Sequence, residues 1–189
     1  MQTVAATSTR NEAVSASIAV LEQCACFLQG IDPTDYQAAC DLLAGSSIGQ
    51  HVRHALDHFS AILQPAQPGI VDYDHRQRDT PIERQPNAAG RLIDEMIRAL
   101  ESLRAPGRPI HVRVMLTSDG RDTLLASSIE RELAFATHHA IHHHAMIAAI
   151  ARTLDLDVPA RFGLAPSTEH HRLQSVHAPN RDAAATADR

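Results

Sequence analysis

Histidine is concentrated in two short segments of this chain. The first segment carries three histidines and the second carries five: His51, His54 and His58, then His138, His139, His142, His143 and His144. Residues four apart on a helix lie one above the other, so two such imidazoles can bind one metal ion. A third imidazole from a facing helix would leave a coordination position open for water or substrate. The spacing therefore predicts a metal site between the two segments.

The second segment offers two pairs of histidines with the required spacing. His139 and His143 share a helical stripe with apolar residues, whereas the stripe of His138 and His142 ends in arginines. We therefore expect His139 and His143 to face the site, with His142 as a nearby alternate.

The first segment is less clear, because spacing relative to its apolar stripe favours His51 or His58 and places His54 nearly opposite. A hydrogen-bonded polar core and an incidental cluster on the surface are the alternatives to a metal site. Metal binding is the preferred interpretation, because imidazoles are costly to bury without partners.

Composition excludes several other kinds of chemistry. All 17 basic residues are arginine, so Schiff-base, pyridoxal-phosphate and P-loop mechanisms that need a lysine are excluded. The formal net charge of −5 argues against a nucleic-acid partner. No signal peptide and no apolar run long enough to span a bilayer are visible, and the cysteine count is odd at three. These features predict a cytoplasmic protein with no membrane association.

Four substantial helices and one hairpin are expected to position the histidines. Apolar spacing, capping residues and turn residues predict helices over 11–29, 33–43 (short), 46–63, 87–103 and 127–154, a long loop over 64–85, and strands over 110–116 and 123–127. The predicted fold is all-α: an up-and-down four-helix bundle with a small β-hairpin insertion before the last helix. Residues 11–168 would form this domain, between a flexible N-terminus (1–10) and a flexible C-terminal tail (169–189).

Two stretches carry a family resemblance. Residues 47–54 read Ser-Ile-Gly-Gln-His-Val-Arg-His and residues 139–143 read His-Ala-Ile-His-His. Over about residues 10–168 the chain resembles the DinB/YfiT-like superfamily of metal-binding four-helix bundles. The resemblance implies one metal ligand on the second helix and two, spaced by four, on the last. These positions fall on His54, His139 and His143, with His51 and His58 as alternates, and the surplus histidines leave a second metal or ligand-supporting roles open.

Within that superfamily the chain is similar to a subgroup with no assigned reaction. The similarity rests on a Tyr-Asp-x-Arg-x-Arg loop over 73–78 and a Phe-Gly-x-Ala-Pro-Ser-Thr segment over 162–168. Other members include metal-dependent transferases acting with low-molecular-weight thiols and the iron-binding domain of sulfoxide synthases. The resemblance therefore implies a metal and, less directly, a thiol substrate.

A loop could supply an anion-binding site beside the metal. Arg76 and Arg78, with Tyr73, could bind a substrate carboxylate or phosphate through bidentate guanidinium contacts. The alternative is a solvated loop in which these arginines pair with Asp74 and Asp79.

Two acidic residues could support the ligands. Asp57 could accept a hydrogen bond from a ligand imidazole. Glu132 could orient a ligand histidine, accept a proton from metal-bound water, or pair with Arg53.

The sequence thus predicts a divalent-metal protein with zinc, nickel or iron as the ion. It would be a transferase or hydrolase acting on a small thiol or other small molecule. The alternatives are a non-catalytic metal-binding or sensing module and a structural bundle. A homodimer is expected for bundles of this kind.

Overall fold

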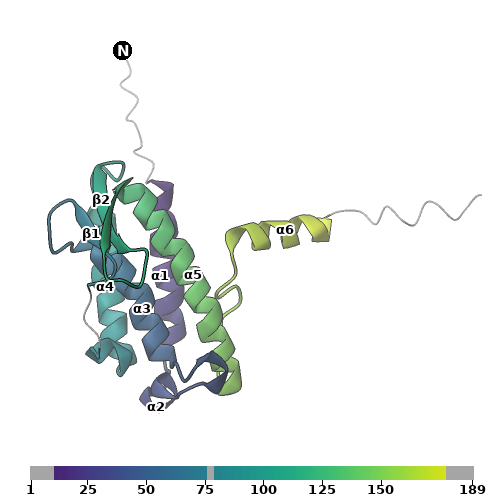
Figure 1. Ribbon diagram of the computed structural model, residues 1–189. Coiled ribbons are helices and arrows are strands. Elements are labelled where there is room, and N and C mark those ends of the chain that lie inside the picture. Colours follow the sequence, from purple (N-terminus) through teal and green to yellow (C-terminus); the bar gives the residue numbers. More distant parts are fainter. Residues whose placement is uncertain (1–10, 76–78, 178–189) are drawn as a thin grey trace, which may run out of the picture.

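The computed structural model describes residues 11–75 and 79–177. Within these ranges the elements are α1 (Glu12–Leu28), α2 (Pro33–Gln37), η1 (Asp41–Leu43), α3 (Ile48–Leu63), β1 (Ile70–Asp72), η2 (Pro81–Glu83), α4 (Pro86–Ser102), β2 (Pro109–Met115), β3 (Asp122–Ser128), α5 (Ile129–Thr153) and α6 (Pro166–His177). The four long helices α1, α3, α4 and α5 pack side by side, with the strands at one end beside the start of α5 (Figure 1). Helix α6 extends away from the other helices (Figure 1).

Side-chain caps fix where the two histidine-bearing helices begin. Ser47 and Gln50 form a reciprocal capping box at the start of α3, which satisfies backbone N–H groups that the first turn leaves unpaired. Helix α5 begins at Ile129, two residues after the predicted start at 127, because the side chain of Ser128 caps it by accepting the hydrogen bond from the Arg131 N–H. Ser127 is thereby free to bind elsewhere, and its hydroxyl donates to Glu132.

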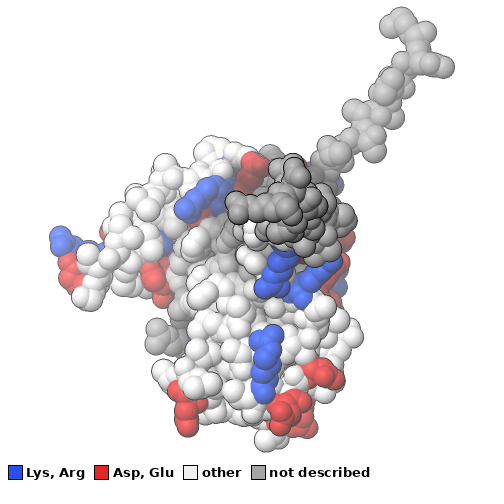
Figure 2. Space-filling view, turned by 90° about the vertical axis from the view of Figure 1, so that its right-hand side faces the viewer, with Lys and Arg blue, Asp and Glu red and all other residues white. Residues whose placement is uncertain are grey.

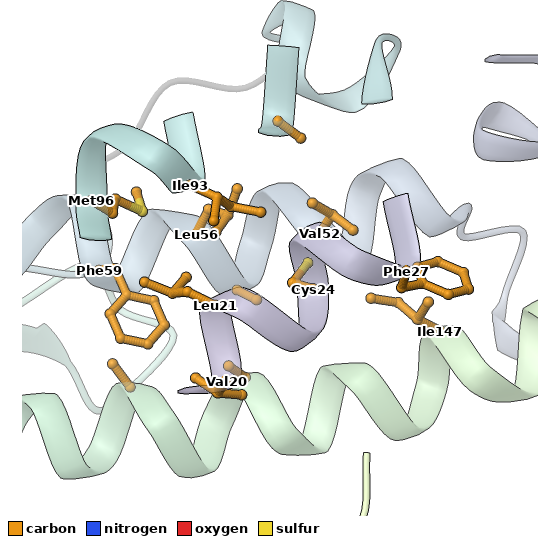
Figure 3. Packing of buried hydrophobic residues seen from close by; sticks show 14 of the residues in the cluster. Val20, Leu21, Cys24, Phe27, Val52, Leu56, Phe59, Ile93, Met96 and Ile147 are labelled. Atoms are coloured by element: carbon orange, nitrogen blue, oxygen red, sulfur yellow. The ribbon is translucent and has the colours of Figure 1, made fainter. Parts of the chain in front are cut away.

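The hydrophobic core lies between the long helices. Figure 3 shows side chains from all four packed together, among them Leu21 of α1, Leu56 and Phe59 of α3, Ile93 of α4 and Ile147 of α5, and each is at most 2% exposed. Burial of apolar surface stabilises this arrangement by roughly 25 cal/mol for each Å² removed from water. The core therefore holds α3 against α5, the two helices that carry the histidines.

The sheet contradicts the predicted fold class. Strands β2 and β3 form the expected antiparallel pair, with Val112 opposite Leu125. A third strand, β1, pairs in parallel with β2 and places Val71 beside Val112. The described residues therefore form six α-helices and a three-stranded mixed sheet, and the prediction of an all-α four-helix bundle is wrong. A three-residue strand has too few positions to show an alternating pattern, so β1 was hidden in the predicted loop over 64–85.

The C-terminal region differs from the expected tail. Residues 166–177 form α6, so part of the segment predicted to be flexible is helical, while residues 178–189 and 1–10 lie outside the described residues. Phe162 and Gly163 precede this helix and attach the chain to α5: Phe162 stacks on His144 with ring centroids 4.3 Å apart. Gly163 has φ +74° and leaves no room for a side chain, because a Cβ would lie 2.4 Å from the Ala145 nitrogen.

The described surface shows charged residues in small separate groups. On the face shown in Figure 2, arginines and acidic residues form small groups, some with both signs in contact, on a largely uncharged surface. In the described part of the chain, no helix combines the length and the apolar character that crossing a bilayer requires. The cytoplasmic location, the homodimer and the absence of a nucleic-acid partner stay predictions.

Candidate metal centre

Three of the expected ligands are brought together between α3 and α5. The Nε2 atom of His139 lies 3.1 Å from the Nε2 atom of His54 and 3.1 Å from the Nε2 atom of His143. The rings of His54 and His143 lie edge to face, with centroids 4.7 Å apart. The structure thus places the predicted His54, His139 and His143 in one cluster, with the Nε2 atom of His139 in contact with the Nε2 atoms of the other two.

The two alternates on α3 also join this cluster. Among the described residues, His54, His58 and His139 each offer a ring nitrogen within 4.8 Å of the other two, so these three form a set that could hold a metal ion. His51 contacts the other end of the cluster, with its Nδ1 atom 3.0 Å from the Nδ1 atom of His143. We call these five residues the imidazole cluster: His51, His54, His58, His139 and His143.

The Nδ1 atoms of two histidines in the cluster have hydrogen-bond partners. The Nδ1–H group of His58 donates to the backbone carbonyl of His54, at 2.9 Å. The Nδ1 atom of His143 is engaged with His51. A histidine that donates from one ring nitrogen carries its lone pair on the other, which is the form that binds a metal. His58 therefore carries its lone pair on Nε2, and His143 does so in the tautomer that donates from Nδ1 to His51.

Burial keeps part of the cluster neutral at physiological pH. Desolvation, and then repulsion from the neighbouring imidazoles, lowers the pKa of His143 to about 2. Desolvation, and then His142, also lowers the pKa of His51. Metal ligation requires neutral imidazole, so His143 needs no deprotonation step to bind a cation at pH 7.

The donor set fits a divalent transition metal. Two nitrogens that bind one tetrahedral zinc ion at about 2.0–2.1 Å lie roughly 3.3 Å from each other, close to the 3.1 Å contacts made by His139. In addition, the Nε2 atom of His51 is buried and has no hydrogen-bond partner among the described residues. Hydrogen bonds among the described residues therefore do not satisfy every ring nitrogen of the cluster.

A buried carboxylate supports one side of the cluster. Glu132 is fully buried and accepts hydrogen bonds from the Tyr73 hydroxyl at 2.6 Å, from the Arg131 guanidinium at 2.7 Å and from the Ser127 hydroxyl. The Tyr73 ring in turn stacks on His58, with centroids 4.9 Å apart. Burial, and then the hydrogen bond to Glu132, raises the pKa of Tyr73, which keeps its phenol protonated as a donor.

Glu132 and Asp57 have partners that the sequence did not identify. Arg53 binds Asp57 at 2.6 Å and Glu83 at 2.7 Å, so the suggested Arg53–Glu132 pair does not form. Glu132 instead acts on the cluster through Tyr73. Its place seven residues before His139, on the same helical face, was the only sequence signal for this role.

The other residues predicted for the site are Tyr73, Arg76, Arg78 and His142. Tyr73 lies against the imidazole cluster, but Arg76 and Arg78 fall outside the described residues. His142 lies beside His143, with ring centroids 5.5 Å apart, and is exposed. Sequence reasoning placed Phe135 on the stripe of His139 without a role at the site, and the structure stacks its ring on His139 with centroids 5.8 Å apart.

Comparisons with known proteins do not show a family. No family model matches the chain, and no solved structure matches it. The chain is 38% identical over 105 residues to FK506-binding protein 5 of Rhizopus delemar, a match that covers 54% of this chain and 27% of that protein. With the mixed sheet, this match does not support a DinB-like four-helix bundle, and that description is withdrawn. Membership in the superfamily itself is not tested by these comparisons.

Proposed function

We propose that this protein binds a divalent transition-metal ion through His54, His139 and a third imidazole, either His143 or His58. The observation that carries the proposal is the pair of 3.1 Å contacts that link the Nε2 atoms of His54, His139 and His143. Zinc, nickel and iron all accept imidazole ligands, so the donor set selects none of them.

We further propose that the site acts on a small molecule, as a metal-dependent transferase or hydrolase. When bound, the ion would supply Lewis-acid chemistry that lowers the pKa of a water molecule or thiol reaching it. The chain's own part is to hold neutral imidazoles in place. His58 is fixed by its bond to the His54 carbonyl and by its stack on Tyr73, which Glu132 anchors.

A metal-buffering or sensing module is the second candidate, favoured by the number of imidazoles in contact. The cluster holds five rings, more than the three that one open catalytic ion needs. Such a module would bind two or more ions per chain and turn over no substrate. The FK506 binding named for the Rhizopus delemar protein is not proposed for this chain, because the match covers 27% of that protein.

Metal titration tests the proposal. Cobalt(II) is titrated into chelator-treated protein while its visible spectrum is followed, and zinc affinity is measured by competition. We expect one tight site per chain, which His139→Ala removes and His138→Ala leaves intact, because His138 is exposed on the same helix. Comparing His143→Ala with His58→Ala identifies the third ligand. Wild-type stoichiometry and affinity in His139→Ala would refute the proposal.

Substrate class is tested on the cobalt-loaded protein. A small thiol such as 2-mercaptoethanol should produce a sulfur-to-cobalt charge-transfer band if the ion keeps a position open to thiols. A stoichiometry of two or more ions, with no band and no turnover of thiol-conjugation or amide substrates, would favour the buffering module.

A further inference from the structure

A pocket lies between the sheet and the start of α5, next to the imidazole cluster. Its volume is about 640 Å³, which is within the range typical of small-molecule sites. Strands β2 and β3 supply apolar walls that include Val112, Val114, Leu116 and Leu125, and α5 supplies Phe135. We call this space the sheet–helix pocket.

Apolar side chains at this pocket remain in contact with water. Leu116 is 65% exposed, Leu125 is 45% exposed and Phe135 is 39% exposed. Three large apolar side chains around one concavity are a costly arrangement for a surface that binds nothing. The pocket thus has both the volume and the apolar wall that a small ligand needs.

The charged groups of the pocket neutralise each other. Arg131 and Glu132 are the charged residues that line it, and they are paired at 2.7 Å. The two carboxylate oxygens of Glu132 already accept bonds from Tyr73, Ser127 and Arg131. An anionic ligand would compete with Glu132 for Arg131, and a cationic ligand would find the carboxylate already occupied. The paired charges that line the pocket therefore favour a neutral ligand.

Two aromatic side chains connect the pocket with the imidazole cluster. Tyr73 lines the pocket and stacks on His58, with centroids 4.9 Å apart. Phe135 also lines the pocket, and its ring lies 5.7 Å from that of His58 and 5.8 Å from that of His139. A ligand in the pocket would thus contact the same rings that pack against two candidate metal ligands.

We propose that the sheet–helix pocket binds a neutral, apolar small molecule with an aromatic or branched hydrocarbon body. Binding itself needs no metal, because none of the five histidines of the imidazole cluster lines the pocket. The pocket's role as the substrate site rests on the metal centre proposed above. If both hold, the substrate of that centre carries an uncharged hydrocarbon portion, which this pocket accommodates.

A matched pair of fluorescent probes tests the proposal. N-phenyl-1-naphthylamine is neutral, and 8-anilino-1-naphthalenesulfonate is a close relative that carries a sulfonate. Each is titrated into the full chain with chelator present, so the result does not depend on metal binding. We expect saturable binding of one neutral probe per chain and weaker binding of the sulfonate. No saturation, or tighter binding of the sulfonate, would overturn the proposal.

Two neighbouring residues of β3 provide the variant and its control. Leu125 lines the pocket, while Leu124 is 54% exposed and does not line it. Leu125→Asp should weaken the neutral probe by at least about tenfold, because it places a charge against an apolar ligand. Leu124→Asp should change the affinity by less than about twofold. Equal effects of the two variants would place the probe elsewhere and refute the assignment.

Coverage of the pocket by a second copy of the chain is the remaining alternative. In that case probe affinity would fall as protein concentration rises, and light scattering would show a dimer that the probe dissociates. That result would overturn the small-molecule proposal. The metal titration is a separate experiment. If the protein binds the neutral probe but no metal, only the proposed metal-dependent function is refuted.

Discussion

The buried imidazole of His144 should make the protein sensitive to mild acid. Its side chain is 2% exposed, its Nδ1 atom has no hydrogen-bond partner among the described residues, and its ring stacks on Phe162. Burial lowers its pKa from 6.5 to about 3. Burial disfavours the charged imidazole in the folded state. Above pH 6.5 the imidazole is mostly neutral in the unfolded state too, so its burial costs little stability there. Stability is lost as pH falls from 6.5 towards 3.

The size of this effect follows from the pKa difference. Each pH unit below the unfolded-state pKa costs about 1.4 kcal/mol, so lowering pH from 7 to 5 should cost about 2 kcal/mol from His144 alone. For a chain of this length, that loss corresponds to a decrease in Tm of roughly 4–8 °C. His143, whose pKa is lowered to about 2, changes stability in the same direction. The contribution of His144 is therefore taken from the difference between wild type and a variant.

Urea unfolding at pH 7 and pH 5, with chelator present, measures the contribution of His144. We expect His144→Leu to lose about 2 kcal/mol less than the wild type between these two pH values. His138→Gln is the control, because His138 is exposed and should keep the wild-type pH dependence. If His144→Leu shows the same loss as the wild type, the imidazole is not held neutral by burial and the reasoning fails.

Three other perturbations test the packing and the site. Gly163→Ala should destabilise the protein by at least about 2 kcal/mol in urea unfolding, because its Cβ would meet the α5 backbone. The control Gly120→Ala has a similar φ but open space around it, so it should cost about 1 kcal/mol. Tyr73→Phe should cost roughly 1.5–3 kcal/mol of folding free energy, because it removes a donor to the buried carboxylate of Glu132. Tyr36→Phe loses a bond to a backbone carbonyl and should cost about 1 kcal/mol. Equal losses for the two tyrosine variants would contradict the expectation that the bond to Glu132 is the stronger of the two. Zinc at one hundred times its Kd should stabilise the protein by about 2.7 kcal/mol, seen as a rise in Tm.

The long helices were predictable from the sequence because their signals are local. Apolar spacing and capping residues located α1, α3, α4 and α5 to within a few residues. Strand β1 was not predictable, because it has three residues and its partner β2 lies about forty positions later. Helix α6 was also missed: it is largely polar, so it shows no clear apolar stripe. The error in fold class came from these elements rather than from the long helices.

The candidate site was predictable in residue type but not in detail. Helical spacing correctly set His139 and His143 on one face of α5, but on α3 it favoured His51 and His58 over His54. All three histidines of α3 reach the cluster, because the site is wide enough to contact more than one stripe of the helix. The contacts of Tyr73 with Glu132 and His58 join residues 59 and 15 positions apart, and no periodic pattern reports on such pairs.

Burial of the imidazole cluster requires a compensating interaction. Five rings lie together, His143 is strongly desolvated, and a nitrogen of His51 has no partner among the described residues. Apolar side chains of similar size would stabilise the contact between α3 and α5 without these costs. A bound cation would satisfy several lone pairs at once and add its binding free energy to that of folding. The cost of the cluster in the metal-free protein is therefore the physical reason to expect that its nitrogens bind a metal.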